Sequence, residues 1–268
     1  MNTSPNKPDF KITELAVLGH PNEGKSSIVS TLAEDDSVSV SPIPGETRVC
    51  TSFPVKIDGQ EVIRFIDTPG FQHPQAILAW IKKDRGSGLE KFENFYHHIE
   101  NDPKFSDDKE LLKPILRGAG IIYVVNGARP LKKVDKIQME ILRLSGLPRL
   151  AIINAKDKSS TYFDEWQQAF KQCFNINRVF NAHTATYQER IELLQCLKSI
   201  DQDLKPVLQK VIESFEQEWK RRNEVTLDKI ANLLQFGLTH FITESYSKDS
   251  NLDDIKIIVH RKYVNTIT

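Results

Sequence analysis

Residues 14–28 read ELAVLGHPNEGKSSI, and this stretch decides the fold. Within it, Gly19–Ser26 matches the pattern G-x-x-x-x-G-K-[ST], whose glycines let the backbone wrap closely around an anion. The apolar run LAVL before the loop is typical of a buried strand, and SSIVSTL after it is typical of the first turns of a helix. Because a helix N-terminus attracts negative charge, the stretch predicts a strand–loop–helix unit that binds phosphate.

Two side chains of this loop have specific chemical roles in such a unit. We expect Lys25 to reach the β- and γ-phosphate oxygens and the Ser26 hydroxyl to ligate Mg²⁺. The alternative is a chance match in a glycine-containing turn, which the strand before the loop and the helix after it disfavour.

Composition restricts the class of protein. The 268 residues suggest one domain with an appendage, and a formal net charge of zero provides no global field for nucleic acid or an anionic membrane. The cysteines Cys50, Cys173 and Cys196 are odd in number and far apart, which argues against a disulfide framework. No run approaches the ~20 apolar residues of a membrane span, and the first residues lack the apolar region of a signal peptide. We expect a cytoplasmic protein without a transmembrane segment or a clear nucleic-acid signature.

Apolar strands alternate with amphipathic helical segments along most of the chain. Strands are expected at 12–18, 50–57, 61–67, 120–126, 149–154 and 178–182. Helices are expected at 25–33, about 75–98, 107–117, 132–145, 162–173 and 186–200. Asp58-Gly59 is a strong hairpin-turn signal, so the second and third strands should be antiparallel neighbours. The helical crossovers predict an α/β fold whose sheet is otherwise parallel and covered on both faces.

The predicted domain organisation has three parts. Residues 1–10 form a flexible leader, 11–201 a nucleotide-binding domain with a helical insertion at about 72–118, and 202–268 a helical C-terminal extension. The aromatic residues of the insertion either pack onto the domain or form a lid or docking surface. Within the extension, the run at 255–259 looks like a strand.

Two further segments suit a nucleotide with bound metal. Asp67-Thr68-Pro69-Gly70 follows an apolar strand, so Asp67 can hold Mg²⁺ through a water and the Gly70 N–H can contact a γ-phosphate. The loop SPIPGETR at 41–48 offers the hydroxyl of Thr47 to the same metal. An ordinary turn and a plain proline–glycine loop are the alternative interpretations.

A third segment addresses the choice of base. Ile152–Asp157 passes from a strand into a loop, and a carboxylate there can accept hydrogen bonds from guanine N1–H and the exocyclic amine. Adenine presents the opposite polarity, and a site built for polar partners rejects an analogue that lacks them. We expect Asp157 to read guanine, and Asn154 to support the purine edge and hold the phosphate loop.

Taken in order, G-x-P-N-x-G-K-S, G-x-T-R, D-T-P-G, N-x-x-D and Asn181-Ala182-His183 resemble the translation-factor class of small GTPases, particularly the Era/TrmE/EngA-like group. The resemblance covers about residues 13–200. The whole chain also resembles a little-characterised family of bacterial GTPases with a helical C-terminal region of unknown function. The implied fold is a P-loop NTPase three-layer G domain.

The resemblance also implies the site residues. Nucleotide-binding residues would be Asn22, Glu23, Gly24, Lys25, Ser26, Ser27, Asn154, Lys156, Asp157, Ala182 and His183. The metal residues would be Ser26 and Thr47 as direct Mg²⁺ ligands with Asp67 behind them, and the catalytic residues Asn22, Lys25, Thr47 and Gly70.

Several positions depart from the pattern of the family. Ala155 stands where N-K-x-D has lysine, which moves to Lys156, and Glu46 places an acidic side chain near the phosphates. Phe71 occupies the position of the water-orienting glutamine of Ras-like enzymes, and Gln72-His73 follow out of phase. In related enzymes a potassium ion replaces an arginine finger with the loop asparagine as a ligand, so Asn22 either binds K⁺ or only stabilises the loop.

These observations favour a regulatory GTPase whose loops 38–49 and 68–80 change order on hydrolysis. A GTP- or GDP-binding scaffold with negligible turnover is the alternative that Phe71 and Glu46 support, and the altered base motif leaves an ATPase open. A protein partner would bind through the 72–118 insertion or the C-terminal helices, and a nucleotide-dependent dimer is implied only by analogy.

Overall fold

The computed structural model describes residues 12–33, 49–155, 161–239, 247 and 250–267. The chain divides into two compact units, Met1–Glu213 and Ser214–Thr268, and each is described by itself. The predicted domain boundaries stay a prediction. The first unit extends past residue 201 because Leu204, Leu208 and Val211 are buried in it.

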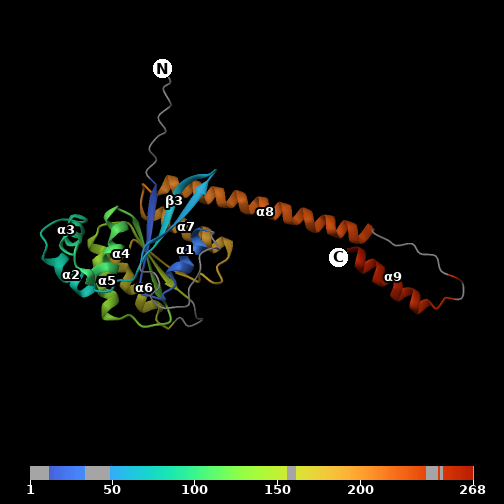
Figure 1. Ribbon diagram of the computed structural model, residues 1–268, viewed down its shortest axis with the longest axis horizontal. Helices are drawn as coiled ribbons and strands as arrows, with labels where there is room; N and C mark the ends of the chain where they lie inside the picture. Colours follow the sequence, from blue (N-terminus) through green and yellow to red (C-terminus); the bar gives the residue numbers. More distant parts are fainter. Residues whose placement is uncertain (1–11, 34–48, 156–160, 240–246, 248–249, 268) are drawn as a thin grey trace, which may run out of the picture. The chain divides into compact units, whose positions relative to one another are not determined.

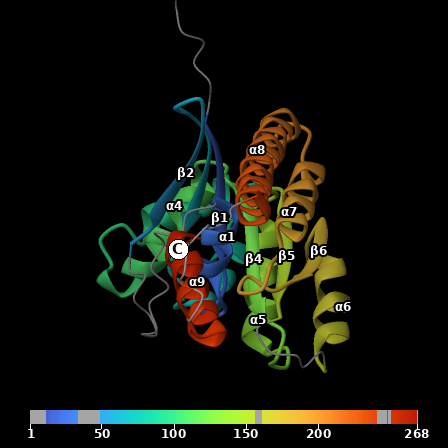
Figure 2. The same ribbon diagram turned by 90° about the vertical axis from the view of Figure 1, so that its right-hand side faces the viewer.

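The first unit, whose elements are drawn in Figure 1, is built on a six-stranded sheet with the order β2-β3-β1-β4-β5-β6, most of whose strands are labelled in Figure 2. The strands are β1 (Thr13–Leu18), β2 (Thr51–Ile57), β3 (Gln60–Asp67), β4 (Gly120–Asn126), β5 (Arg149–Asn154) and β6 (Ile176–Phe180). All neighbouring pairs are parallel except β2 with β3, so the predicted mostly parallel sheet is confirmed. Its central strands β4 and β5 are buried almost throughout, as strands covered on both faces must be.

The β2–β3 hairpin turns at the predicted dipeptide. Asp58 and Gly59 have φ angles of 52° and 75°, the pair of left-handed conformations that a type I′ turn requires. Aspartate tolerates this region better than most residues and glycine adopts it without strain, which is why this dipeptide marks the turn.

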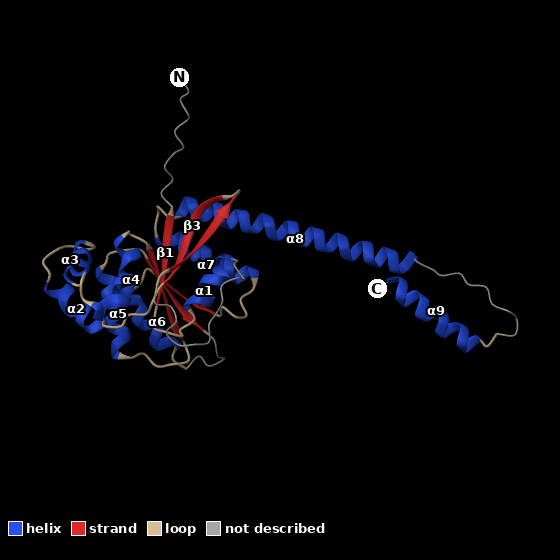
Figure 3. Cartoon of the chain, in the orientation of Figure 1, coloured by secondary structure: helices blue, strands red, loops and turns tan. Residues whose placement is uncertain are grey.

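Helices cover both faces of the sheet, as Figures 2 and 3 show for the first unit. They are α1 (Lys25–Ala33), α2 (Pro74–Lys83), α3 (Glu90–His98), α4 (Ser106–Leu116), α5 (Lys133–Leu144), α6 (Phe163–Cys173) and α7 (Tyr187–Ile200), with a short 3-10 turn at Pro103–Phe105. Helices α1 and α7 pack together on one face, and α2 to α6 pack on the other. The main core lies under the second group, and it includes Phe92, Phe95 and Trp166 together with alternate residues of β4 and β5.

Three elements differ from the sequence prediction. The helix expected at 75–98 is divided into α2 and α3 by the segment containing Gly86 and Gly88, because glycine destabilises a helix interior. The last strand of the sheet ends at Phe180, before the expected residue 182. The strand expected at 255–259 is wrong, because these residues lie in helix α9 (Leu252–Ile267). Ile255, Ile258 and Val259 follow helical spacing, and acidic residues occupy the first turn.

The second unit contains the later part of α8 (Lys205–Thr239) and α9. Large apolar side chains are exposed along this part of α8, among them Leu227, Leu233, Leu234 and Leu238. No helix in the described part of the chain combines the length and apolar character that a membrane span needs.

Candidate functional site

The candidate site forms at one edge of the sheet. Strands β1, β3, β4 and β5 are mutually parallel, so the residues that follow Leu18, Asp67, Asn126 and Asn154 emerge at the same edge. In open α/β sheets, ligands bind outside the carboxyl ends of the strands. The fold therefore gathers the predicted motifs, which lie far apart in the sequence.

The phosphate loop has the backbone geometry that its glycines predict. Gly19 has a φ angle of 150°, and a Cβ atom there would lie 2.2 Å from the carbonyl oxygen of Val124. Gly24 and Asn22 also have positive φ angles, of 96° and 65°. The chain then enters α1 at Lys25, so the loop opens directly onto the N-terminus of a helix.

The phosphate-loop lysine and serine are positioned next to the aspartate of β3. Lys25 is buried and donates from Nζ to the His20 carbonyl oxygen at 3.1 Å. The Ser26 hydroxyl donates to Asp67 Oδ2 at 2.6 Å. The neighbouring Ser27 is buried in the first turn of α1.

Asp67 has a carboxylate oxygen that is available to a cation. Its Oδ1 atom is buried and has no hydrogen-bond partner among the described residues. Burial raises its pKa, against the opposing effects of the Ser26 hydrogen bond and the Lys25 charge. A hydroxyl and a carboxylate with a spare oxygen suit Mg²⁺, which prefers oxygen ligands. Thr47, the other predicted ligand, lies outside the described residues.

The D-T-P-G segment packs against the phosphate loop. The Thr68 hydroxyl donates to the Val17 carbonyl oxygen at 2.8 Å and is fully buried. A Cβ atom on Gly70 would lie 2.9 Å from Pro21 Cδ and 3.0 Å from the Gly19 carbonyl oxygen. Glycine is therefore required where the backbone of this segment approaches the loop.

The residues after Gly70 are held by the helical insertion. Phe71 is buried in the main core, where it cannot orient a water molecule. Asp108 of α4 accepts from the Gln72 N–H at 2.9 Å and from the His73 N–H at 3.4 Å, and its second oxygen lies 2.9 Å from His73 Nδ1. Asp108 cannot be found from the sequence, because its only local signal is an acidic residue in a first helical turn.

The base-recognition motif is partly described. Asn154 is buried and donates from Nδ2 to the Glu23 carbonyl oxygen at 2.9 Å, so it links the end of β5 to the phosphate loop. The Ala182 carbonyl oxygen accepts from the Thr31 hydroxyl of α1 at 3.2 Å, and His183 is exposed. Lys156 and Asp157 lie outside the described residues.

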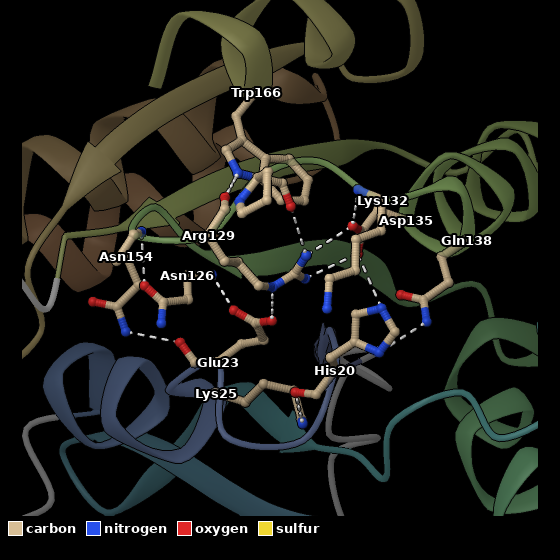
Figure 4. A network of polar contacts seen from close by, with 12 residues as sticks. His20, Glu23, Lys25, Asn126, Arg129, Lys132, Asp135, Gln138, Asn154 and Trp166 are labelled. Carbon is tan, nitrogen blue, oxygen red and sulfur yellow. Dashed lines mark hydrogen bonds and ion pairs between the residues drawn. The ribbon is translucent and has the colours of Figure 1, made fainter. Parts of the chain in front are cut away.

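A network of polar contacts, in which the carboxylates are buried and Arg129 and His20 are half-buried, lies beside the phosphate loop (Figure 4). The buried carboxylate of Glu23 accepts from Arg129 Nε at 2.7 Å and from the Asn126 N–H. Arg129 in turn donates to both oxygens of Asp135, at 2.7 and 2.9 Å. The Trp166 indole packs against the guanidinium with 5.0 Å between Arg129 Cζ and the ring, and its N–H donates to the Arg129 carbonyl oxygen.

The network returns to the beginning of the loop through Asp135. His20 Nε2 lies 2.9 Å from Asp135 Oδ1, and the Lys132 N–H donates to Oδ2 at 2.7 Å. Burial raises the pKa of Asp135, but the hydrogen bonds from His20, Arg129 and Lys132 outweigh it and hold the pKa well below its usual range. His20 Nδ1 also lies 3.4 Å from Gln138 Nε2. This network has no signal in the sequence, because its members are far apart along the chain.

This geometry defines a P-loop nucleotide-binding domain, and comparison with known proteins identifies the family. A model described as "50S ribosome-binding GTPase" matches residues 14–155, and a model described as "Domain of unknown function (DUF3482)" matches residues 167–263. The first match covers more than half of the chain. The chain therefore belongs to the 50S ribosome-binding GTPase family, as a small GTPase of the Era/TrmE class.

Curated relatives agree with this assignment. The tRNA modification GTPase MnmE of Oceanobacillus iheyensis is 26% identical over 196 residues, which cover 72% of this chain and 41% of the relative. GTPase Era of Mycoplasmopsis agalactiae is 28% identical over 166 residues, which cover 61% of this chain and 57% of the relative. The chain thus spans about two fifths to three fifths of these relatives. The probable GTP-binding protein EngB of Aliarcobacter butzleri is 30% identical over 180 residues, which cover 58% of this chain and 89% of the relative.

A solved structure supports the fold. Era in complex with MgGDPNP and a segment of 16S ribosomal RNA superposes with a TM-score of 0.50 and 18% identity. The match covers 70% of this chain and 56% of that chain. At this identity the similarity shows the G-domain fold alone.

Proposed function

We propose that this protein binds GTP with Mg²⁺ and hydrolyses it to GDP and phosphate as a regulatory switch. The observation that carries the proposal is the arrangement of Lys25, Ser26, Asp67 and Gly70 around one phosphate loop, in a chain that belongs to a GTPase family. The buried lysine and the buried carboxylate with a spare oxygen suit phosphates and metal, and they do not favour the alternative of a GTP- or GDP-binding scaffold with negligible turnover.

The residues of the loop bind and orient the triphosphate. Backbone N–H groups around Gly24 surround the phosphates, and Lys25 compensates the charge on their terminal oxygens. Ser26 and Asp67 would hold Mg²⁺ together with Thr47. When bound, Mg²⁺ would neutralise negative charge on the phosphates. Gly70 offers its N–H to the γ-phosphate, so this contact exists only in the triphosphate state.

Guanine is the proposed base. Asp157 would accept hydrogen bonds from the N1–H and amine of guanine, with the Ala182 N–H donating to O6 and the side chains of Lys156 and His183 beside the base. Asn154 supports this assignment because it already links the base motif to the phosphate loop. A comparison of equilibrium GTP and ATP binding tests it. Equal affinity for ATP would favour the ATPase alternative.

The switch is proposed to act through the insertion. The segment that contacts the γ-phosphate at Gly70 is tied two residues later to Asp108 of α4. A change in the Gly70 contact therefore reaches an element that could bind a protein partner. The exposed apolar residues of α8 are the other candidate partner surface.

Potassium stimulation is a narrower proposal. Asn22 stands where the loop asparagine of related enzymes ligates K⁺. Its positive φ angle is an alternative reason for an asparagine here, because asparagine tolerates the left-handed region better than most residues. The ion would neutralise charge in the place of an arginine finger. Cytoplasmic location and nucleotide-dependent dimerisation stay predictions of the sequence.

The first experiment is GTP turnover by the purified chain with Mg²⁺, in KCl and in NaCl at equal ionic strength. We expect slow turnover that K⁺ accelerates, loss of the acceleration in Asn22→Ala, and loss of nucleotide binding in Lys25→Ala. Tight GTP binding without turnover in either salt would favour the scaffold alternative. Absence of GTP binding would contradict the proposed function.

A further inference from the structure

The phosphate loop contains a buried acidic side chain, which is unexpected in a site for anions. Glu23 lies between Asn22 and Gly24, in the part of the loop whose N–H groups would face the phosphates. Its side chain is only 5% exposed. An uncompensated carboxylate here would repel a triphosphate, because charges interact strongly where water is excluded.

The structure compensates Glu23 on both of its polar ends. The carboxylate accepts hydrogen bonds from Arg129 Nε and from the Asn126 N–H, and the backbone carbonyl oxygen accepts one from the Asn154 side-chain amide. Every one of these donors comes from the segments that follow β4 and β5 or from the ends of these strands. Glu23 is therefore the point at which the phosphate loop is fixed to the neighbouring strands.

Arg129 is itself firmly held. Both of its terminal nitrogens bind Asp135, and its guanidinium packs on Trp166. Burial lowers the pKa of Arg129. The interactions with Asp135 and Glu23 raise this pKa by more, so the side chain stays charged. Asp135 also binds His20, the second residue of the loop. One arginine–aspartate pair therefore holds the loop at His20 and at Glu23.

We propose that Arg129 is a positioning residue for nucleotide binding. It cancels the charge of Glu23 and, through Glu23, sets the orientation of the N–H groups that receive the phosphates. The inference rests on the proposed nucleotide-binding function and adds a residue outside all the recognised nucleotide motifs.

The test measures the dissociation constant of GDP and the free energy of unfolding for wild type, Arg129→Met, Glu23→Gln and the double variant. In Arg129→Met the buried Glu23 charge is uncompensated, and we expect GDP affinity to fall by at least about tenfold. Glu23→Gln removes the charge but keeps an acceptor for the Asn126 N–H, so its GDP affinity is the reference against which the double variant is compared.

The double variant gives the decisive result. With no carboxylate at position 23, GDP affinity should return to within about threefold of Glu23→Gln. Stability should not return, because Asp135 still lacks Arg129. This separation of affinity from stability would not arise if Arg129 only supported the fold. Where Arg129→Met fails to fold, Arg129→Lys keeps the charge without the bidentate pair and should weaken GDP binding by about threefold or more.

Arg149→Met is the matched control. Arg149 is a half-buried arginine at the opposite end of β5, where it donates to the Cys173 carbonyl oxygen, so its loss should reduce stability and leave GDP affinity unchanged. Wild-type GDP affinity in Arg129→Met, or no recovery in the double variant, would overturn the inference. A wild-type chain that binds no guanine nucleotide would instead overturn the proposed function.

Discussion

The two segments that meet at the phosphate position are held in different ways. The phosphate loop is fixed by charge at Glu23, where Arg129 connects it to Asp135. The segment after Gly70 is fixed by the apolar Phe71 and by hydrogen bonds from residues 72–73 to Asp108. The first set of contacts comes from the segment after β4 and from α5, and the second comes from the insertion.

This difference suggests a division of roles. A loop held by a charged network within the nucleotide domain is pre-organised, so it can bind phosphate without rearrangement. The segment after Gly70 is held by the apolar Phe71 and by one carboxylate of the insertion, Asp108. Its contacts can therefore change at a lower cost in free energy. We therefore propose that the first segment sets nucleotide affinity and that the second responds to the γ-phosphate.

The largest expected effect is on Phe71. Replacing it by alanine leaves a cavity in the main core, and we expect the free energy of unfolding to fall by about 3 to 5 kcal/mol. Urea denaturation followed by tryptophan fluorescence measures the change. A loss below about 1 kcal/mol would show that Phe71 does not anchor the segment.

Asp108→Ala tests the other anchor of the same segment. It leaves the Gln72 and His73 donors without their acceptor, so we expect a loss of about 3 kcal/mol. In Asp108→Ala, the rates of amide hydrogen exchange in the insertion should no longer differ between the GTP-bound and the GDP-bound protein. Asp107→Ala is the control because Asp107 is the neighbouring acidic residue in the same first turn and, unlike Asp108, is not buried. A nucleotide response that persists in Asp108→Ala would contradict the proposed route.

Asp135→Asn tests the charged network and its dependence on pH. The pKa of Asp135 is lowered in the folded state, so its ionised form stabilises the fold above the ordinary pKa of about 3.9 and this contribution is lost as pH falls below it. We expect Asp135→Asn to cost about 2 kcal/mol at pH 7 and less at acidic pH. Denaturation curves of both proteins between acidic pH and pH 7 measure this loss. A loss of unfolding free energy that did not depend on pH would contradict the role of the ionised Asp135.

The smallest expected effect is on Gln72. Its side chain is exposed and donates to the Gly70 carbonyl oxygen at 3.2 Å. We expect Gln72→Ala to change stability by less than about 0.5 kcal/mol and GTP turnover by less than about threefold. A loss of turnover of about a hundredfold at unchanged stability would instead identify Gln72 as the residue that orients water.

The sequence alone determined the elements whose signals are local. The strand–loop–helix around Gly19–Ser26, the hairpin at Asp58-Gly59 and the continuous buried strands follow from neighbouring residues, and so does the assignment to the small GTPase class. The order of the motifs along a parallel sheet also implied that they share one edge.

Tertiary structure decided the contacts that have no local signal. Glu23 and Arg129 are separated by 106 positions, and Gln72 and Asp108 by 36, so no periodicity or motif links them. The strand expected at 255–259 was wrong because short runs of β-branched residues are compatible with both a strand and a helix. Backbone preference is set by neighbouring residues, whereas the partner of a buried charge is set by which strands the fold places side by side.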